Sequence, residues 1–312
     1  MRLIPEIVAD CGCALGESPL WHPGQRVLYW IDIPTGRLFR CDPAKDGYEE
    51  LLRIDLIGGL AIQEQAGLLL LLSDGFMGVL GDGGLRKRKL LHRDQRGFRF
   101  NDAIADPRGR VFAGTMAYAR KPHTLAGRIE RKLRRALGVK PTSTKRAGNL
   151  YRFDPDGTAT VVVHGVGRPN GMGFSPDRNT FYATDTMAQE VYGFDYDEET
   201  GTIANQRAVI RIPADDGHPD GLTVDAEGCL WCALMDSGCV TRFTSAGREI
   251  DRIQFPTNKL TSVMFGGEDY RDLYVTSASG DRGEIHGSAA GAVFRVRVAT
   301  PGLPEYYSRI PF

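Results

Sequence analysis

The chain has 312 residues, in which 39 Lys and Arg balance 39 Asp and Glu, so its formal net charge is zero. A neutral chain has no general attraction for a polyanion, and no nucleic-acid partner is expected. A hydrophobic content of 42% is ample for a core, and 38 glycines with 17 prolines are typical of a turn-rich fold rather than a disordered one.

The N-terminal segment lacks the apolar run of a signal peptide, and no stretch of about eighteen apolar residues occurs. We therefore expect a cytoplasmic protein without a transmembrane segment. The six cysteines are then expected to remain thiols. Cys229 and Cys232 lie three apart in a predicted strand and face opposite ways, which disfavours a zinc site.

Six segments of one design follow one another along the chain. Each contains a short apolar strand, a turn rich in Pro, Gly or Asp, and a second apolar strand, often with a third. Their opening residues are Glu17, Gly58, Asn101, Asn170, Asp220 and Thr261. Most openings are about forty to fifty residues apart, the spacing of a propeller blade. The pattern predicts an all-β fold: one six-bladed β-propeller of four-stranded antiparallel blades, spanning residues 1–312 as a single domain.

The interval between Asn101 and Asn170 is about thirty residues too long for one blade. The surplus falls at residues 117–148, which carry ten Lys and Arg against Glu130 alone, a balance of +9. Apolar residues from Leu125 to Leu137 recur at three- and four-residue steps, which predicts an inserted basic amphipathic helix. Three interpretations stay open: the helix packs on the propeller, it forms a lid that steers anionic substrates, or residues 120–146 dock on an acidic partner or anionic surface.

Four of the opening residues carry side-chain oxygens: Glu17, Asn101, Asn170 and Asp220. Equivalent positions in a propeller lie at equivalent radii, so these side chains are expected to converge on the axis. Carboxylate and amide oxygens suit Ca²⁺ or Mg²⁺ better than softer metals. Arg99 lies two residues before Asn101, and in an extended segment both point the same way, toward a bound substrate.

Three further polar residues lie close to these positions or at strand ends: Asp102, Asp185 and His218. For each of them a structural role in a turn or loop is the favoured interpretation. Motifs for other hydrolase and nucleotide-binding chemistries are absent from the sequence, including G-x-S-x-G, H-E-x-x-H and the P-loop.

Several motifs together resemble one known family. They are Glu17-Ser-Pro-Leu-Trp, Arg99-Phe-Asn-Asp, Gly114-Thr-Met, Pro169-Asn-Gly and Pro219-Asp-Gly, and they resemble the regucalcin (senescence marker protein), gluconolactonase and luciferin-regenerating enzyme family. The resemblance implies a six-bladed propeller that holds a divalent metal in its central channel and hydrolyses lactones, commonly those of sugars.

The resemblance also implies roles for particular residues. The metal ligands are expected at Glu17, Asn170 and Asp220, the substrate contacts at Arg99 and Asn101, and the general base at Asp220. Relatives that act on gluconolactone often carry a Glu soon after Gly-Thr-Met. Here the segment continues Met116-Ala-Tyr-Ala-Arg, so the native lactone is not specified.

The leading functional hypothesis is a metal-dependent hydrolase that opens a sugar-type lactone, as gluconolactonase does. Ca²⁺ is the expected ion, with Zn²⁺, Mg²⁺ and Mn²⁺ also compatible with the ligands. The alternatives are a promiscuous esterase or phosphotriesterase, and a non-catalytic Ca²⁺-binding regulator or protein-binding propeller. A monomer or weak dimer is expected.

Overall fold

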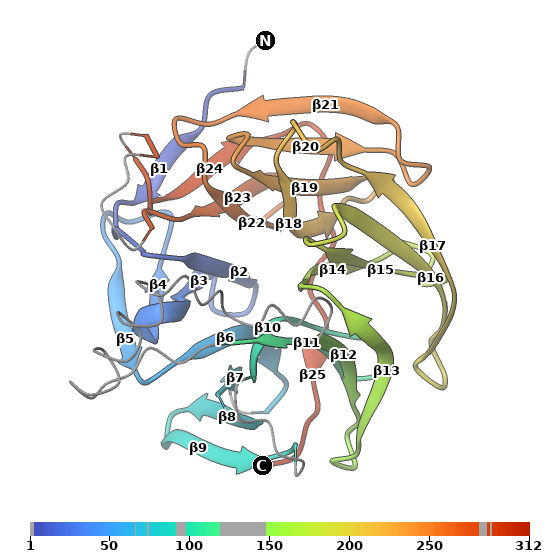
Figure 1. The fold of residues 1–312 in the computed structure, drawn as a ribbon. Coiled ribbons are helices and arrows are strands. Elements are labelled where there is room, and N and C mark those ends of the chain that lie inside the picture. The colour runs from blue at the N-terminus through green and yellow to red at the C-terminus, as the bar shows by residue number, and fades with distance from the viewer. Residues whose placement is uncertain are drawn as a thin grey trace, which may run out of the picture.

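The computed structural model describes residues 3–65, 67–73, 75–91, 98–118, 148–280, 286–287 and 289–312. Six antiparallel sheets stand around a central axis (Figure 1). The first three sheets contain β2 (Gly16–His22), β3 (Val27–Asp32), β4 (Arg37–Cys41) and β5 (Glu49–Arg53); β6 (Ile57–Gln63), β7 (Gly67–Leu72), β8 (Phe76–Gly81) and β9 (Gly84–Lys89); and β10 (Phe98–Ala105), β11 (Val111–Ala117), β12 (Gly148–Phe153) and β13 (Ala159–Val166).

The other three sheets contain β14 (Pro169–Phe174), β15 (Thr180–Asp185), β16 (Glu190–Asp197) and β17 (Thr202–Arg211); β18 (His218–Val224), β19 (Leu230–Met235), β20 (Cys239–Phe243) and β21 (Glu249–Gln254); and β22 (Leu260–Gly266), β23 (Asp272–Ser277), β24 (Val293–Arg297) and β1 (Glu6–Ala9). The predicted six-bladed propeller is confirmed. In the described part of the chain the only helix is the 3-10 turn η1 (Ile33–Thr35), and no helix there is long and apolar enough to cross a membrane.

The two ends of the chain contribute strands that the repeat did not predict. β1 pairs with β24, with Ile7 opposite Phe294, so the N-terminal strand completes the blade built from the C-terminal strands. β25 (Tyr307–Ser308) pairs in parallel with β6 and gives that sheet a fifth strand. Strand pairing between the two ends of the chain thereby closes the circle of blades, without a covalent bond.

The predicted insertion lies almost entirely outside the described residues. β11 ends at Ala117 and β12 begins at Gly148, so the two outermost residues of the range 117–148 belong to strands. The structure does not describe residues 119–147. The basic helix and its three interpretations therefore remain predictions.

Each blade places its opening residue on its first strand, which is the strand nearest the axis (Figure 1). Every first strand also has a register shift beside that residue, where a β-bulge re-aims the side chains. The six shifts lie at Glu17/Leu20, Ile57/Gly59, Asn101/Ala103, Pro169/Met172, Pro219/Leu222 and Leu260/Ser262. The repeat thus specifies a common position and a common local distortion.

Two glycines directly after opening residues permit the first strands to approach closely. A Cβ on Gly171 would lie 2.0 Å from the backbone nitrogen of Leu222, and one on Gly221 would lie 2.2 Å from Oγ of Ser262. Only glycine fits where backbones pass this near. The Asn-Gly and Asp-Gly pairs of the repeat therefore bring neighbouring blades together beside the axis.

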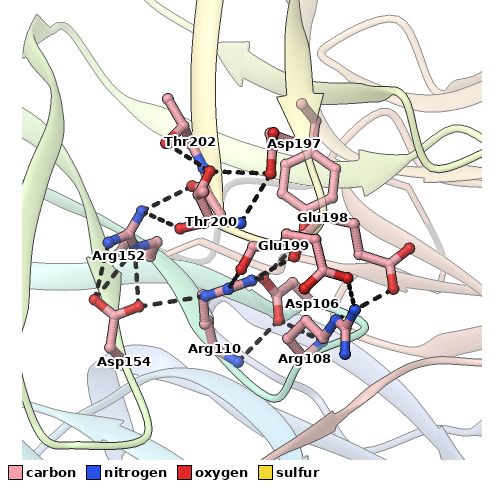
Figure 2. Close-up of polar contacts among 12 residues, drawn as sticks. Asp106, Arg108, Arg110, Arg152, Asp154, Asp197, Glu198, Glu199, Thr200 and Thr202 are labelled. Carbon is pink, nitrogen blue, oxygen red and sulfur yellow. Dashed lines mark hydrogen bonds and ion pairs between the residues drawn. The ribbon is translucent and has the colours of Figure 1, made fainter.

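A buried polar network joins the third and fourth blades, and Figure 2 shows it around Asp106 and Arg110. The Asp106 carboxylate, fully buried, accepts hydrogen bonds from the Arg110 backbone at 2.9 Å, from the Arg110 guanidinium at 2.9 Å and from the Tyr196 hydroxyl at 2.8 Å. Arg110 also donates to the carbonyl of Glu198 at 2.9 Å. This aspartate therefore fixes a turn and a blade interface at once.

Candidate metal centre and active site

Four opening residues meet beside the axis, from β2, β10, β14 and β18. Glu17, Asn101, Asn170 and Asp220 are all at most 5% exposed. The Asn101 amide donates to Oδ1 of Asn170 at 3.1 Å and to the carbonyl of Pro169 at 2.8 Å, and the Asn170 amide donates to Oδ1 of Asp220. We call these four residues the ring.

The other two opening residues do not join the ring. Gly58 has no side chain, and its place is closed by the backbone of Phe100, whose oxygen would lie 2.2 Å from an added Cβ. The Thr261 hydroxyl donates to the carbonyl of Gly16 and lies 2.9 Å from the hydroxyl of Thr276. These two positions support neighbouring blades instead of supplying ligands.

The two carboxyl groups of the ring both have raised pKa values. Burial raises the pKa of Glu17 well above its ordinary value, and the neighbouring charge of Asp220 raises it further. Burial likewise raises the pKa of Asp220 to about 8, against the opposing charges of Arg168 and Arg99. Oδ2 of Asp220 is buried without a hydrogen-bond partner. A buried carboxylate oxygen in this state is destabilising unless a cation or proton meets it.

The donor set fits a hard divalent cation. Glu17 and Asp220 offer carboxylate oxygens, and rotation of the Asn170 amide by a half-turn exchanges its nitrogen and oxygen, which presents the oxygen to Asp220. No three His, Cys, Asp or Glu side chains gather at one point within the described ranges. The reason at the ring is plain, because its third candidate ligand is an amide.

Arg99 lies next to the ring on β10, opposite Met116 of β11. Its guanidinium donates to the carbonyl of Phe100 at 2.8 Å and lies 5.9 Å from the centre of the Tyr118 ring. Burial lowers the pKa of Arg99 to about 10, so the group is still charged at neutral pH. The shared direction of Arg99 and Asn101 stays a prediction. Tyr118 was not predicted, since nothing in the repeat singles it out.

The three polar residues with favoured structural roles behave differently from one another. The Asp185 carboxylate accepts backbone hydrogen bonds from Gly167 at 2.9 Å, from Arg168 at 3.0 Å and from Met187 at 3.1 Å, which is the turn role that we expected. Nδ1 of His218 lies 3.7 Å from the Asp236 carboxylate at the surface. Asp102 differs, because its side chain lines the channel below the ring.

A cavity of about 30 Å³ occupies the channel below the ring, with room for about two waters. Its polar lining includes Asp102 and Glu305. The C-terminal segment closes this end: Gly302 is bridged to Asp225, directly after β18 of the fifth sheet, and Tyr307 pairs with Ile62 in the second sheet. Burial, with a contribution from the charge of Asp102, raises the pKa of Glu305 to about 7. The described C-terminal residues thus cover the lower end of the channel, and we expect a substrate to approach the ring from the end where the first strands begin.

The chain matches the family model described as the SMP-30/Gluconolactonase/LRE-like region over residues 15–279. It is 42% identical to pentonolactonase XacC of Haloferax volcanii over 310 residues, with 97% of each chain covered. It is 36% identical to the 6-deoxy-6-sulfogluconolactonase of Pseudomonas putida over 300 residues, covering 93% of this chain and 94% of the relative.

Regucalcin of Gallus gallus is 34% identical over 308 residues, with 96% of this chain and 97% of the relative covered. Among solved structures, a calcium-binding regucalcin from Agrobacterium tumefaciens superposes with a TM-score of 0.83 at 25% identity, covering 99% of each chain. A luciferin-regenerating enzyme superposes with a TM-score of 0.81 at 24% identity, covering 98% of this chain and 99% of that one. The chain belongs to the SMP-30/gluconolactonase/LRE-like family.

Proposed function

We propose that this protein is a lactonase that opens a sugar-type lactone by attack of water on the carbonyl carbon of the lactone. Two relatives that match over almost the whole chain are named as sugar lactonases. The observation that carries the proposal is Oδ2 of Asp220, a buried carboxylate oxygen without a partner beside a second buried carboxyl group. Such an oxygen can bind a cation and can also accept a proton.

The residues that would hold the cation are Glu17, Asn170 and Asp220. When bound, a divalent ion polarises a carbonyl oxygen and lowers the pKa of a bound water. Ca²⁺ suits these hard oxygen donors best, and Mg²⁺, Mn²⁺ and Zn²⁺ remain compatible with them.

The other steps belong to residues of the chain. In this scheme Asp220 takes a proton from water as the water oxygen bonds to the carbonyl carbon. The carbon–oxygen bond of the lactone ester then breaks, the leaving oxygen takes a proton, and the product carboxylic acid ionises. Arg99, whose guanidinium donates a single hydrogen bond among the described residues, to the carbonyl of Phe100, holds substrate hydroxyls, and Asn101 borders the substrate.

A calcium-binding role without turnover is the second candidate. It is supported by the similarity to regucalcins, one of which is described as a calcium-binding protein. Promiscuous esterase or phosphotriesterase activity is compatible with the same arrangement. Cytoplasmic location and a monomeric or weakly dimeric state remain predictions from the sequence.

Proton release from a panel of sugar lactones, with and without a chelator, tests the proposal. We expect Asp220→Ala to lower kcat by roughly 10²–10⁴-fold, the usual contribution of a general base. Asp195→Asn is the matched control, since that carboxylate is exposed and bonds Arg207 on the outer part of its blade. Full activity in chelated protein or in Asp220→Ala would refute the mechanism, and metal binding without turnover of any lactone would favour the calcium-binding candidate.

A further inference from the structure

A second set of equivalent positions lies two residues before each opening residue. The third to sixth blades carry a basic residue there, namely Arg99, Arg168, His218 and Lys259, and the first and second carry Leu15 and Leu56. We call the four basic residues the basic rim. Four of six equivalent positions are therefore basic, on adjacent blades.

The backbone directs these side chains toward the entrance of the channel. Residues two apart in an extended segment point to the same side, so Arg99, Arg168 and His218 point to the side of the ring residue that lies two positions later in the chain. Arg168 and His218 precede prolines, which favours the extended conformation. Lys259 is bridged to Met235, and Met235 also pairs with His218, so His218 and Lys259 flank one residue across two blades.

Two backbone hydrogen bonds fix the position of the rim residue Arg168. Its backbone nitrogen donates to Asp185 at 3.0 Å and its carbonyl accepts from Thr186 at 3.1 Å, directly before Pro169 and the ring residue Asn170. Its positive charge is felt at two residues of the site, because it opposes the rise in the pKa of Asp220 and adds to the fall in that of Arg99.

No described residue neutralises the positive charges of Arg168 and Lys259 through a direct contact. Among the described residues, neither side chain forms a hydrogen bond or an ion pair. His218, by contrast, lies 3.7 Å from Asp236, which offsets its charge when it is protonated. The unused positive charge of the rim therefore centres on Arg168 and Lys259, with Arg99 beside them.

The opposite end of the channel has the opposite character. Below the ring, the small closed cavity is lined by Asp102 and Glu305. An anionic group cannot be placed there without steric and electrostatic cost. A substrate whose carbonyl lies at the ring must therefore direct any negative group back toward the basic rim.

We propose that the substrate is a lactone with an anionic group, such as a carboxylate, phosphate or sulfonate, on the carbon chain away from its ring carbonyl, and that Arg168 is the residue that selects it. This inference rests on the proposed lactonase function and deepens it. Lys259 adds a second positive charge, and Arg99 joins the anion site to the ring. Guanidinium groups suit all three oxyanions because they donate two parallel hydrogen bonds.

The test compares glucono-1,5-lactone with 6-phosphoglucono-1,5-lactone and a glucaric acid lactone, so that the neutral, phosphate and carboxylate arms are separate. We expect kcat/KM to be at least about ten-fold higher for one of the anionic arms, and higher salt to reduce this preference. Arg168→Gln should reduce the ratio of anionic to neutral kcat/KM by about ten-fold or more, the usual effect of losing a charged hydrogen bond. Arg168→Lys should retain part of the preference.

Arg248→Gln is the matched control, since it makes the same change in net charge at an exposed position in the turn between β20 and β21. It should leave the ratio unchanged. Equal kcat/KM for all arms, or an equal loss on all arms in Arg168→Gln, overturns the inference while leaving lactonase activity intact.

If no lactone is hydrolysed, the proposed function fails and the anion site is tested by binding alone. Calorimetry would then compare gluconate with 6-phosphogluconate, which differ only in the distal phosphate. Tighter binding of 6-phosphogluconate that is lost in Arg168→Gln supports the site, and equal binding of the two acids overturns it.

Discussion

Replacing Asp220 by asparagine is expected to shift thermal stability in opposite directions with and without a divalent cation. Asp220 is 1% exposed, its Oδ2 has no partner, and the buried carboxyl of Glu17 lies close enough for each charge to destabilise the other. Without a cation, Asp220 stays largely protonated at neutral pH because its pKa is raised to about 8, and asparagine, which needs no proton, relieves a cost of about 1–3 kcal/mol. With a cation, the same substitution removes a ligand.

The size of both shifts follows from the length of the chain. At about 2.1 cal/mol/K per residue, 312 residues give an unfolding entropy of about 0.66 kcal/mol/K. Relief of about 1–3 kcal/mol then raises Tm by about 2–5 °C. A cation at about one hundred times its Kd stabilises the wild-type fold by about 2.7 kcal/mol, or about 4 °C, and Asp220→Asn should lose most of this gain.

Differential scanning fluorimetry in EDTA and in excess Ca²⁺ measures both effects on one sample. Asp195→Asn, an exposed carboxylate on the outer part of its blade, should behave like the wild type in both buffers. The reasoning is refuted if Ca²⁺, Mg²⁺, Mn²⁺ and Zn²⁺ all stabilise Asp220→Asn as much as the wild type. It is equally refuted if the variant melts well below the wild type in EDTA.

Three further predictions concern the channel and its scaffold. Because the pKa of Glu305 is raised to about 7, the folded state keeps a proton that the unfolded state has lost, and the free energy of unfolding falls as pH rises from about 4.5 to 7. Urea titrations at pH 5 and pH 8 should show this fall, and Glu305→Gln should reduce it by up to about 3 kcal/mol. Asp106→Asn should destabilise the fold by about 1–3 kcal/mol in urea, because it removes the buried carboxylate that accepts from Arg110 and Tyr196 while Asp154 still pairs with Arg110, and an unchanged midpoint would contradict this. Gly171→Ala should be more damaging than Gly83→Ala in the same titration, since a Cβ on Gly171 meets backbone at 2.0 Å and one on Gly83 meets nothing within 4 Å.

The ring could be predicted from the sequence because its geometry is set by repetition. One alignment of opening residues places Glu17, Asn101, Asn170 and Asp220 at one height and one radius, and the structure brings these side chains together. The prediction did not need the lengths of individual strands. It needed only that the blades be equivalent, which the six bulges beside the opening residues also reflect.

Features outside the repeat could not be predicted in this way. Glu305 reaches the channel from a C-terminal segment whose course depends on single contacts, such as the bridge of Gly302 to Asp225. Tyr118 lies by Arg99 because of the register of β10 and β11, which local sequence does not specify. The pairing of β1 with β24 likewise joins residues at opposite ends of the chain.

Height along the channel is set by the offset of a residue from the opening of its repeat. The basic rim lies two residues before the opening residue, and the opening residue itself belongs to the ring. The next residue can face the lower channel because of the bulge, as Asp102 does with its positive φ of 66°. Asp185 and Thr186 hold Arg168 through its backbone, whereas Thr186 and Asn101 hold Asn170 through its side chain. Substitution at the rim can therefore change which lactones are accepted while the ring keeps its ligands. On this reasoning Arg168, rather than any member of the ring, is the position at which members of this family with different substrates should differ.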